Sequence, residues 1–104
     1  AEQRLHEVPY NCELQGKQES GLIDALFRQQ GSWSLVEFKT DRVWDMAGGS
    51  RLLAELDYIP QVQRYSQVVK QMLGQRPEAI LCWLNFGDGI LVQEVTAEGE
   101  IRGR

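Results

Sequence analysis

The pattern of hydrophobic and polar positions predicts three strands before residue 41. Leu5–Leu14 reads as a first strand, which Pro9 marks as an edge or an irregular point, and the residues "QGKQES" after it read as a turn. Gly21–Thr40 then holds two apolar-rich runs on either side of "RQQGSW". Such runs, separated by a connection that contains glycine, predict a β-hairpin.

The second half of the chain predicts one long helix and two more strands. Tyr58–Leu73 has Pro60 in its first turn, and Gly74 and Pro77 follow its end. Its apolar residues recur at helical spacing: Val62, Tyr65, Val69, Met72 and Leu73. "EAILCWLNF" and "GILVQEV" read as strands around "GDG", whereas "TAEGEIRGR" reads as a polar tail. In the mixed segment Asp41–Asp57, "AGGS" reads as a flexible break and "RLLAEL" as a short helical turn. We therefore expect an α/β sandwich: a central mixed sheet of about five strands, with a long helix after the third.

The predicted hairpin has a register that brings two acids together. A loop centred on Gln30 and Gly31 pairs residues whose numbers sum to 61, so Asp24 lies opposite Glu37. Opposed side chains are only about 4.5–5.5 Å apart at Cβ, where like charges destabilise the pair. The strand period of two puts Lys39 on the same face as Glu37. That face also carries Leu22, Leu26 and Leu35, and the opposite face is expected to be a core face of Ile23, Ala25, Phe27, Val36 and Phe38.

Composition narrows the class of protein. The 104 residues suit one domain, 42% of them are hydrophobic, and no apolar run is long enough for a membrane span. We expect a cytoplasmic protein, in the bacterial cytosol or nucleoid, with Cys12 and Cys82 as reduced thiols, although a disulfide stays open. His6 is the only histidine, which argues against a histidine-rich metal site or a Ser-His-Asp triad. The net charge of −4 indicates that the chain would not grip nucleic acid by itself.

The opposed acids suit a divalent cation. Mg²⁺ prefers carboxylate oxygens, backbone carbonyls and water, so Asp24, Glu37 and the carbonyl of Phe38 are candidate ligands for Mg²⁺ or Mn²⁺. Lys39 would then act on the attacking water or on charge developing at a phosphoryl group. The plainer alternative is a cross-strand salt-bridge cluster of little energetic value.

These motifs resemble a known family. "GLIDALF…WSLVEFKTD" resembles the PD-(D/E)xK nuclease superfamily, in particular its RecB-like exonuclease branch, with Asp24, Glu37 and Lys39 at the motif positions. The branch also has a Gln-x-x-x-Tyr helix motif, which Gln61 and Tyr65 match. "HEVPY" is similar to the strand that precedes the hairpin in the C-terminal nuclease domains of UvrD-like helicases of the AddA type. The resemblance runs from about Glu7 to Val95.

The resemblance implies a restriction-endonuclease-like fold and a metal-dependent DNA nuclease that leaves 5′-phosphate and 3′-hydroxyl ends. It implies an exonuclease attached to a helicase region in DNA repair or recombination, with DNA as partner and no membrane. Glu7, Gln61 and Tyr65 would be accessory residues, against plain roles as a strand acid, a helix-face hydrogen bond and a core-edge aromatic. The family's upstream helix with a metal-binding histidine is not matched, so we expect a fragment of a larger chain that is weakly active or inactive alone. The four-cysteine iron–sulfur site of some relatives is also absent.

Three residues outside these motifs are candidate DNA contacts. Trp44 is the tryptophan best placed to stack on a base, and Arg42 and Arg51 are candidate phosphate contacts. Trp33 and Trp83 are expected in the core or at its edge. A different class of function stays open, namely a nuclease-fold module that has lost its chemistry and binds DNA ends or scaffolds a complex. A nuclease of a phage or CRISPR-associated protein is a third, weaker reading.

Overall fold

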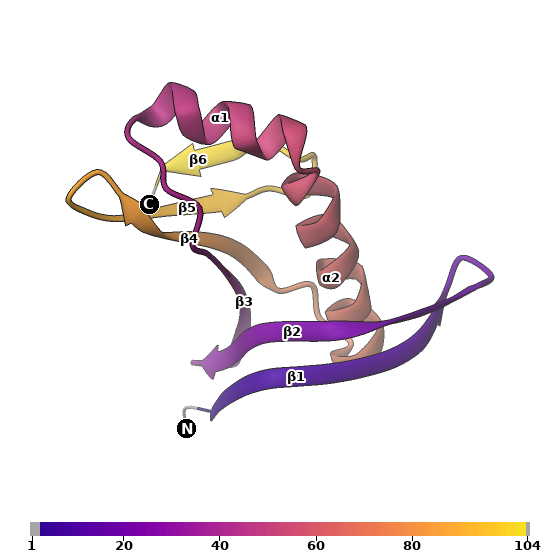
Figure 1. Ribbon diagram of the computed structural model, residues 1–104. Coiled ribbons are helices and arrows are strands. Elements are labelled where there is room, and N and C mark those ends of the chain that lie inside the picture. The colour runs from indigo at the N-terminus through magenta and orange to yellow at the C-terminus, as the bar shows by residue number, and fades with distance from the viewer. Residues whose placement is uncertain (1–2, 104) are drawn as a thin grey trace.

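The computed structural model describes residues 3–103 and shows one mixed sheet with two helices (Figure 1). The strands lie in the sheet in chain order: β1 (Gln3–Leu14), β2 (Lys17–Gln29), β3 (Ser32–Lys39), β4 (Glu78–Phe86), β5 (Gly89–Val95) and β6 (Ile101–Gly103). Neighbours are antiparallel except β3 and β4, which are parallel. The connection between these two holds α1 (Met46–Glu55) and α2 (Tyr58–Leu73). In this range no helix has the length and apolar character that a membrane crossing needs.

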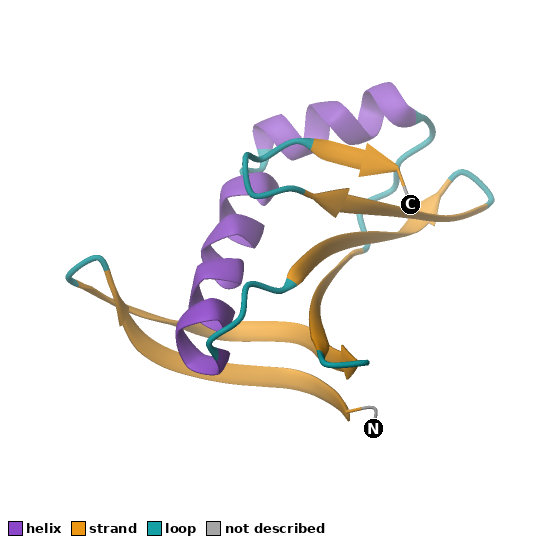
Figure 2. Ribbon diagram, turned by 180° about the vertical axis from the view of Figure 1, so that it is seen from behind, coloured by secondary structure: helices purple, strands orange, loops and turns teal. Residues whose placement is uncertain are grey.

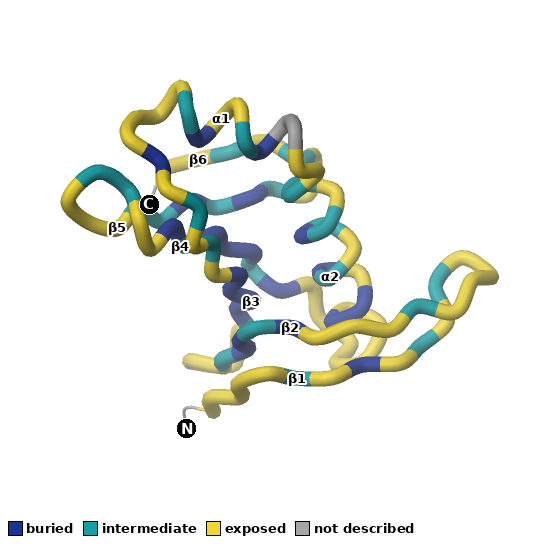
Figure 3. Tube along the Cα trace, viewed as in Figure 1, coloured by how far each residue is buried: buried dark blue, intermediate teal, exposed yellow. Residues whose placement is uncertain are grey.

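The main core lies between the sheet and the two helices. Trp83, Leu81 and Leu35 are fully buried in the middle of the sheet, and the Trp83 indole donates a hydrogen bond of 2.9 Å to Gln93. The helices add Leu53 from α1 and Val62, Val68 and Val69 from α2 to the same cluster. Buried positions are therefore concentrated in β3, β4 and the facing side of α2 (Figure 3).

The expected sandwich with about five strands and a single long helix is wrong. The described chain forms a mostly β structure with six strands, and two helices follow the third strand. The expected break at "AGGS" is wrong, because these residues and most of the expected helical turn "RLLAEL" form one helix, α1, whose N-terminus the Asp45 carboxylate caps by accepting from the Gly48 N–H at 2.8 Å. Strand β6 lies in the polar tail and pairs with β5 through backbone groups, which need no apolar side chains.

The first hairpin is longer than its sequence indicates. β1 and β2 pair along almost their whole length, from Gln3 with Arg28 to Leu14 with Lys17, and the hairpin extends beyond the rest of the sheet (Figure 2). Only Gln15 and Gly16 form the turn, and both have positive φ (52° and 79°), as in two-residue hairpin loops of type I′. The expected turn "QGKQES" is thus wrong over Lys17–Ser20, which belong to β2.

The predicted register of the second hairpin is confirmed, because Ala25 pairs with Val36 and Gln29 with Ser32. The expected division of its two faces is partly wrong. Ile23 lies in the helix-side core with Leu26 and Leu35, while Leu22 is 48% exposed. The alternation of side chains between the two faces is interrupted at Asp24. Across from Asp24 lies Glu7, a non-glycine residue with a φ of 51°. It stands between the regular pairs His6–Ala25 and Val8–Ile23.

Candidate functional site

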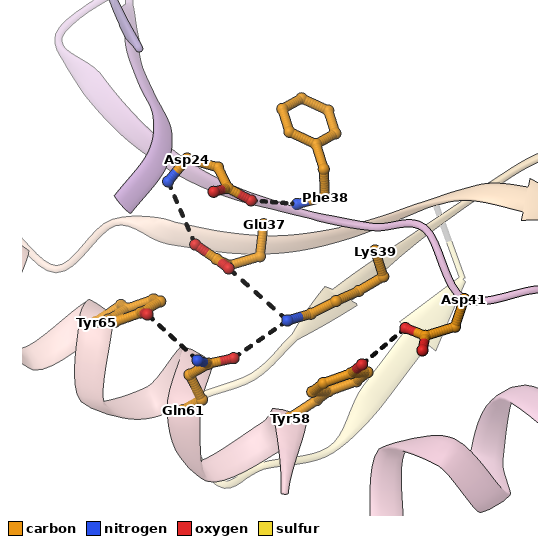
Figure 4. A network of polar contacts seen from close by, with 8 residues as sticks. All are labelled: Asp24, Glu37, Phe38, Lys39, Asp41, Tyr58, Gln61 and Tyr65. Atoms are coloured by element: carbon orange, nitrogen blue, oxygen red, sulfur yellow. Dashed lines mark hydrogen bonds and ion pairs between the residues drawn. The ribbon is translucent and has the colours of Figure 1, made fainter. Parts of the chain in front are cut away.

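The candidate site lies where β2 and β3 stop pairing. Their regular ladder ends at Ala25 and Val36. Beyond that pair, side chains take over the hydrogen bonds: the Phe38 N–H donates to Asp24 Oδ2 at 2.9 Å, and the Asp24 N–H donates to Glu37 Oε1 at 3.4 Å (Figure 4). The separation of the strands therefore gives each acid a backbone donor from the other strand.

Glu37 is the buried acid of this pair, with only 4% of its surface exposed. Burial first, and then the negative charge of Asp24, raise the pKa of Glu37 from 4.5 to about 7, against smaller opposing effects of the Asp24 N–H and Lys39. Such a shift marks a carboxylate that lacks sufficient positive charge nearby.

Lys39 is held from three sides. Its Nζ lies 3.8 Å from Glu37 Oε2, donates to Gln61 Oε1 at 3.1 Å, and sits 3.8 Å from the centre of the Tyr58 ring. A lysine side chain carries much rotamer freedom, so these contacts fix its ammonium group beside the acid pair. Figure 4 shows Asp24, Glu37 and Lys39 in one connected network.

Gln61 and Tyr65 of α2 extend this network. Gln61 Nε2 donates to the Tyr65 hydroxyl at 3.3 Å, so the i, i+4 pair connects Lys39 to the helix. Burial raises the pKa of Tyr65, and the charges of Glu37 and Asp24 raise it further. Tyr65 also packs edge-on against Tyr10 of β1. Both predicted accessory residues of the helix thus lie beside the acids.

Glu7 lies on another side of Asp24. It is exposed on β1 and lines a cavity of about 360 Å³ with His6, Asp24 and Phe38. Its placement is compatible with an accessory acid near Asp24.

The three predicted DNA contacts form a separate group after β3. The Arg42 guanidinium lies 3.9 Å from the centre of the Trp44 ring and donates to Asn85 Oδ1 at 3.3 Å. Arg42, Trp44 and Arg51 line one cavity of about 330 Å³ beside α1. Trp44 is 71% exposed, so its ring is available to a ligand. Asp45 lines the same cavity, but its carboxylate is engaged as the cap of α1.

Two site residues were missed from the sequence. The Tyr58 hydroxyl donates to Asp41 Oδ2 at 2.7 Å, and burial together with this bond raises the pKa of Tyr58 to about 12. Tyr58 is three residues before Gln61, a spacing that places both on one helix face, and Asp41 is two residues after Lys39. Spacing along the helix could have identified Tyr58, whereas its contact with Asp41 needs the tertiary fold.

The acid pair suits a divalent cation that keeps water ligands better than a cation held entirely by protein side chains. Within residues 3–103, no three His, Cys, Asp or Glu side chains gather as a metal-binding group. Mg²⁺, however, commonly takes only one or two protein carboxylates, with water and substrate oxygens completing its shell. Asp24 and Glu37 are two such carboxylates, and a cation between them would offset the burial and repulsion that raise the pKa of Glu37.

No protein-family model matches the chain, and no curated protein matches it. We therefore infer function from the site itself.

Proposed function

We propose that this protein is a metal-dependent DNA nuclease that hydrolyses phosphodiester bonds, with Asp24, Glu37 and Lys39 as its catalytic residues. One observation carries the proposal: two carboxylates, one of them almost fully buried, meet beside an immobilised lysine at the end of a hairpin. A purely structural ion pair has no need of the second, repelling acid.

Each residue has a role in this proposal. Asp24, Glu37 and the Phe38 carbonyl would hold Mg²⁺ or Mn²⁺, which when bound lowers the pKa of water and offsets charge on phosphoryl oxygens. Lys39 orients the attacking water or stabilises charge that develops on the phosphate. Gln61 and Tyr58 keep its ammonium group in place. Water adds to phosphorus and the bond to the 3′ oxygen breaks, which leaves a 5′-phosphate and a 3′-hydroxyl.

The resemblance to RecB-like exonucleases supplies the wider setting of the proposal. In this setting the chain acts in DNA repair or recombination in the bacterial cytosol. Its substrates are DNA ends that a helicase region exposes. Glu7 and Tyr65 are accessory residues at the two sides of the acid pair, and Arg42, Trp44 and Arg51 contact the DNA.

Cation binding tests the proposal without any need for catalysis. We expect Mn²⁺ titrated into the protein to bind at one site, and Asp24→Asn or Glu37→Gln to weaken it by about tenfold or more, since even outer-shell changes have such effects. Asp88→Asn, which changes an exposed acid in the β4–β5 turn, is the matched control and should leave binding unchanged. Equal Mn²⁺ affinity in all four proteins would remove the acid pair from the function.

One observation favours a second function, a DNA-binding module without chemistry. Asp24 accepts from the Phe38 N–H, and Glu37 lies beside Lys39, so both acids have partners within the chain itself. This module would bind DNA through Arg42 and Trp44 but would show neither Mn²⁺ binding at the acids nor cleavage.

A further inference from the structure

Asp41 is an acid beside the candidate site to which the proposed mechanism gives no role. It lies two residues after Lys39, where the chain leaves β3, and its Oδ2 accepts a hydrogen bond of 2.7 Å from the Tyr58 hydroxyl. The Lys39 ammonium lies over the ring of the same tyrosine, with Nζ 3.8 Å from the ring centre. Asp41 is therefore linked to Lys39 through the Tyr58 ring (Figure 4).

The backbone on either side of Asp41 is held by the strand next to β3. Before Asp41, the Thr40 carbonyl accepts a hydrogen bond from Asn85 Nδ2 at 3.2 Å. After it, the Val43 N–H donates to the Asn85 carbonyl at 3.0 Å. A side chain on a fixed backbone holds its partner in one position more precisely than a side chain on a free loop. Asp41 thus presents its carboxylate to Tyr58 from a defined place.

The Tyr58 hydroxyl is a lasting donor to Asp41. Burial, and then the hydrogen bond to Asp41 and the charge of that carboxylate, raise the pKa of Tyr58 to about 12, so the hydroxyl keeps its proton at neutral pH. The bond fixes the orientation of the ring and polarises the hydroxyl toward the carboxylate. Since the face of an aromatic ring attracts an ammonium ion through its negative charge, both effects favour Lys39 in its observed position.

The acid pair makes such support important. Lys39 Nζ lies 3.8 Å from Glu37 Oε2, and Lys39 would have to share this carboxylate with a cation held by the acid pair. Two positive charges at such short range repel each other. Gln61 offers Lys39 an uncharged acceptor at 3.1 Å, whereas Tyr58 and Asp41 add a negative ring face and a carboxylate that is not a candidate ligand.

We infer that Asp41 is a positioning residue for Lys39 and acts through the Tyr58 ring. The inference rests on the proposed function, because that reaction needs the ammonium group at a fixed place beside the acids. The plainer role of the bond between Asp41 and Tyr58 is to anchor the first turn of α2, since within residues 3–103 the N-cap Asp57 makes no side-chain capping hydrogen bond. An anchor alone would act on stability and not through Lys39.

The position of the Lys39 side chain is measurable without metal or DNA. The chain has three lysines, Lys17, Lys39 and Lys70, so ¹³C-labelled lysine gives three sets of side-chain signals, and Lys39→Arg identifies one set by its loss. Protons above an aromatic ring are shielded, so the Lys39 methylene next to Nζ should resonate upfield of the other two. Asp41→Asn should move this signal toward the other two. Glu13→Gln, which removes an exposed charge at the far end of β1, should leave it in place. An unmoved Lys39 signal in Asp41→Asn would overturn the inference.

Single-turnover DNA cleavage tests whether Asp41 acts through Lys39. Asp41→Asn should slow cleavage by about tenfold or more, the scale of one hydrogen bond to a charged group. In a Lys39→Ala protein the same substitution should have little further effect, because residues that act together are not additive. Tyr58→Phe keeps the ring and loses the hydroxyl, so it should reproduce Asp41→Asn in both measurements.

The outcomes separate the inference from the proposed function. Equal slowing by Asp41→Asn in the wild-type and Lys39→Ala proteins would overturn the inference and leave the proposed function standing. Equal cleavage by the wild-type and Lys39→Ala proteins would instead contradict the proposed function. If the chain alone does not cleave DNA, the Lys39 signals decide by themselves whether Asp41 positions the ammonium group.

Discussion

Asp24 and Glu37 occupy positions where a regular hairpin would place a ladder pair. Their side chains instead accept hydrogen bonds from backbone N–H groups of the opposite strands, so backbone donors position both acids. The register that opposes them could be derived from residue numbers alone, and so could the face that Lys39 shares with Glu37. The burial of Glu37 could not be derived from the sequence, because it depends on α2 packing over this end of the sheet.

The pH dependence of stability tests the environment of Glu37. Its pKa is about 7 in the folded protein and 4.5 when solvated, so ionisation opposes folding. Stability from the protonated group is fully present below pH 4.5 and is lost as pH rises through 7, by about 3 kcal/mol for the difference of 7 − 4.5 pKa units. Urea unfolding in EDTA should show this fall in wild type and not in Glu37→Gln. Parallel pH profiles of the two proteins would show that Glu37 is ordinarily solvated.

Trp44 tests the proposed DNA surface. Its exposed ring stacks on Arg42, and loss of one base stack costs about 1–3 kcal/mol. Trp44→Ala should therefore weaken binding of a fluorescein-labelled single strand, measured by anisotropy in Ca²⁺. Met72→Ala, an exposed apolar residue at the far end of α2, is the control. Unchanged affinity of Trp44→Ala would assign that ring to something other than DNA.

Among the elements, those with strong side-chain patterns were predicted and those held by backbone or cap contacts were not. α2 was predicted over Tyr58–Leu73, the bounds it has, because an apolar stripe, Pro60 and Gly74 all agree. α1 contains two glycines, and its stability depends on the Asp45 cap and on Leu53 packing in the core. β6 has three residues and depends on backbone pairing with β5, which leaves no side-chain pattern.

The substitution Ser66→Ala tests how a buried hydroxyl in α2 affects stability. Its hydroxyl is buried and has no hydrogen-bond partner among the residues described. A buried unpaired polar group costs about 1–3 kcal/mol, and alanine is also the better helix former. Ser66→Ala should raise the free energy of unfolding by about 1 kcal/mol in urea. Ser50→Ala, at an exposed position of α1, should raise the free energy of unfolding by less. A destabilised Ser66→Ala protein would mean that the Ser66 hydroxyl has a partner in solution.

At the scale of the whole molecule, the 15 acidic residues outnumber the 11 lysines and arginines. The net charge of −4 gives weak attraction to phosphate, so Arg42 and Arg51 are expected to position DNA rather than to provide strong affinity. The sequence predicted the order of the first five strands and the long helix. It could not show that both helices cover one face, because the apolar residues of β3 and β4 point to both sides.

The most direct test of the nuclease proposal is single-turnover DNA cleavage by wild type and Lys39→Ala in saturating Mg²⁺, with DNA affinity measured in Ca²⁺. In the proposed mechanism Lys39 acts mainly in the transition state, so its loss should lower the cleavage rate by about 10²-fold or more while affinity barely changes. Excess protein over DNA makes slow cleavage by the chain alone measurable. Equal, measurable cleavage rates in the two proteins would contradict the proposed function.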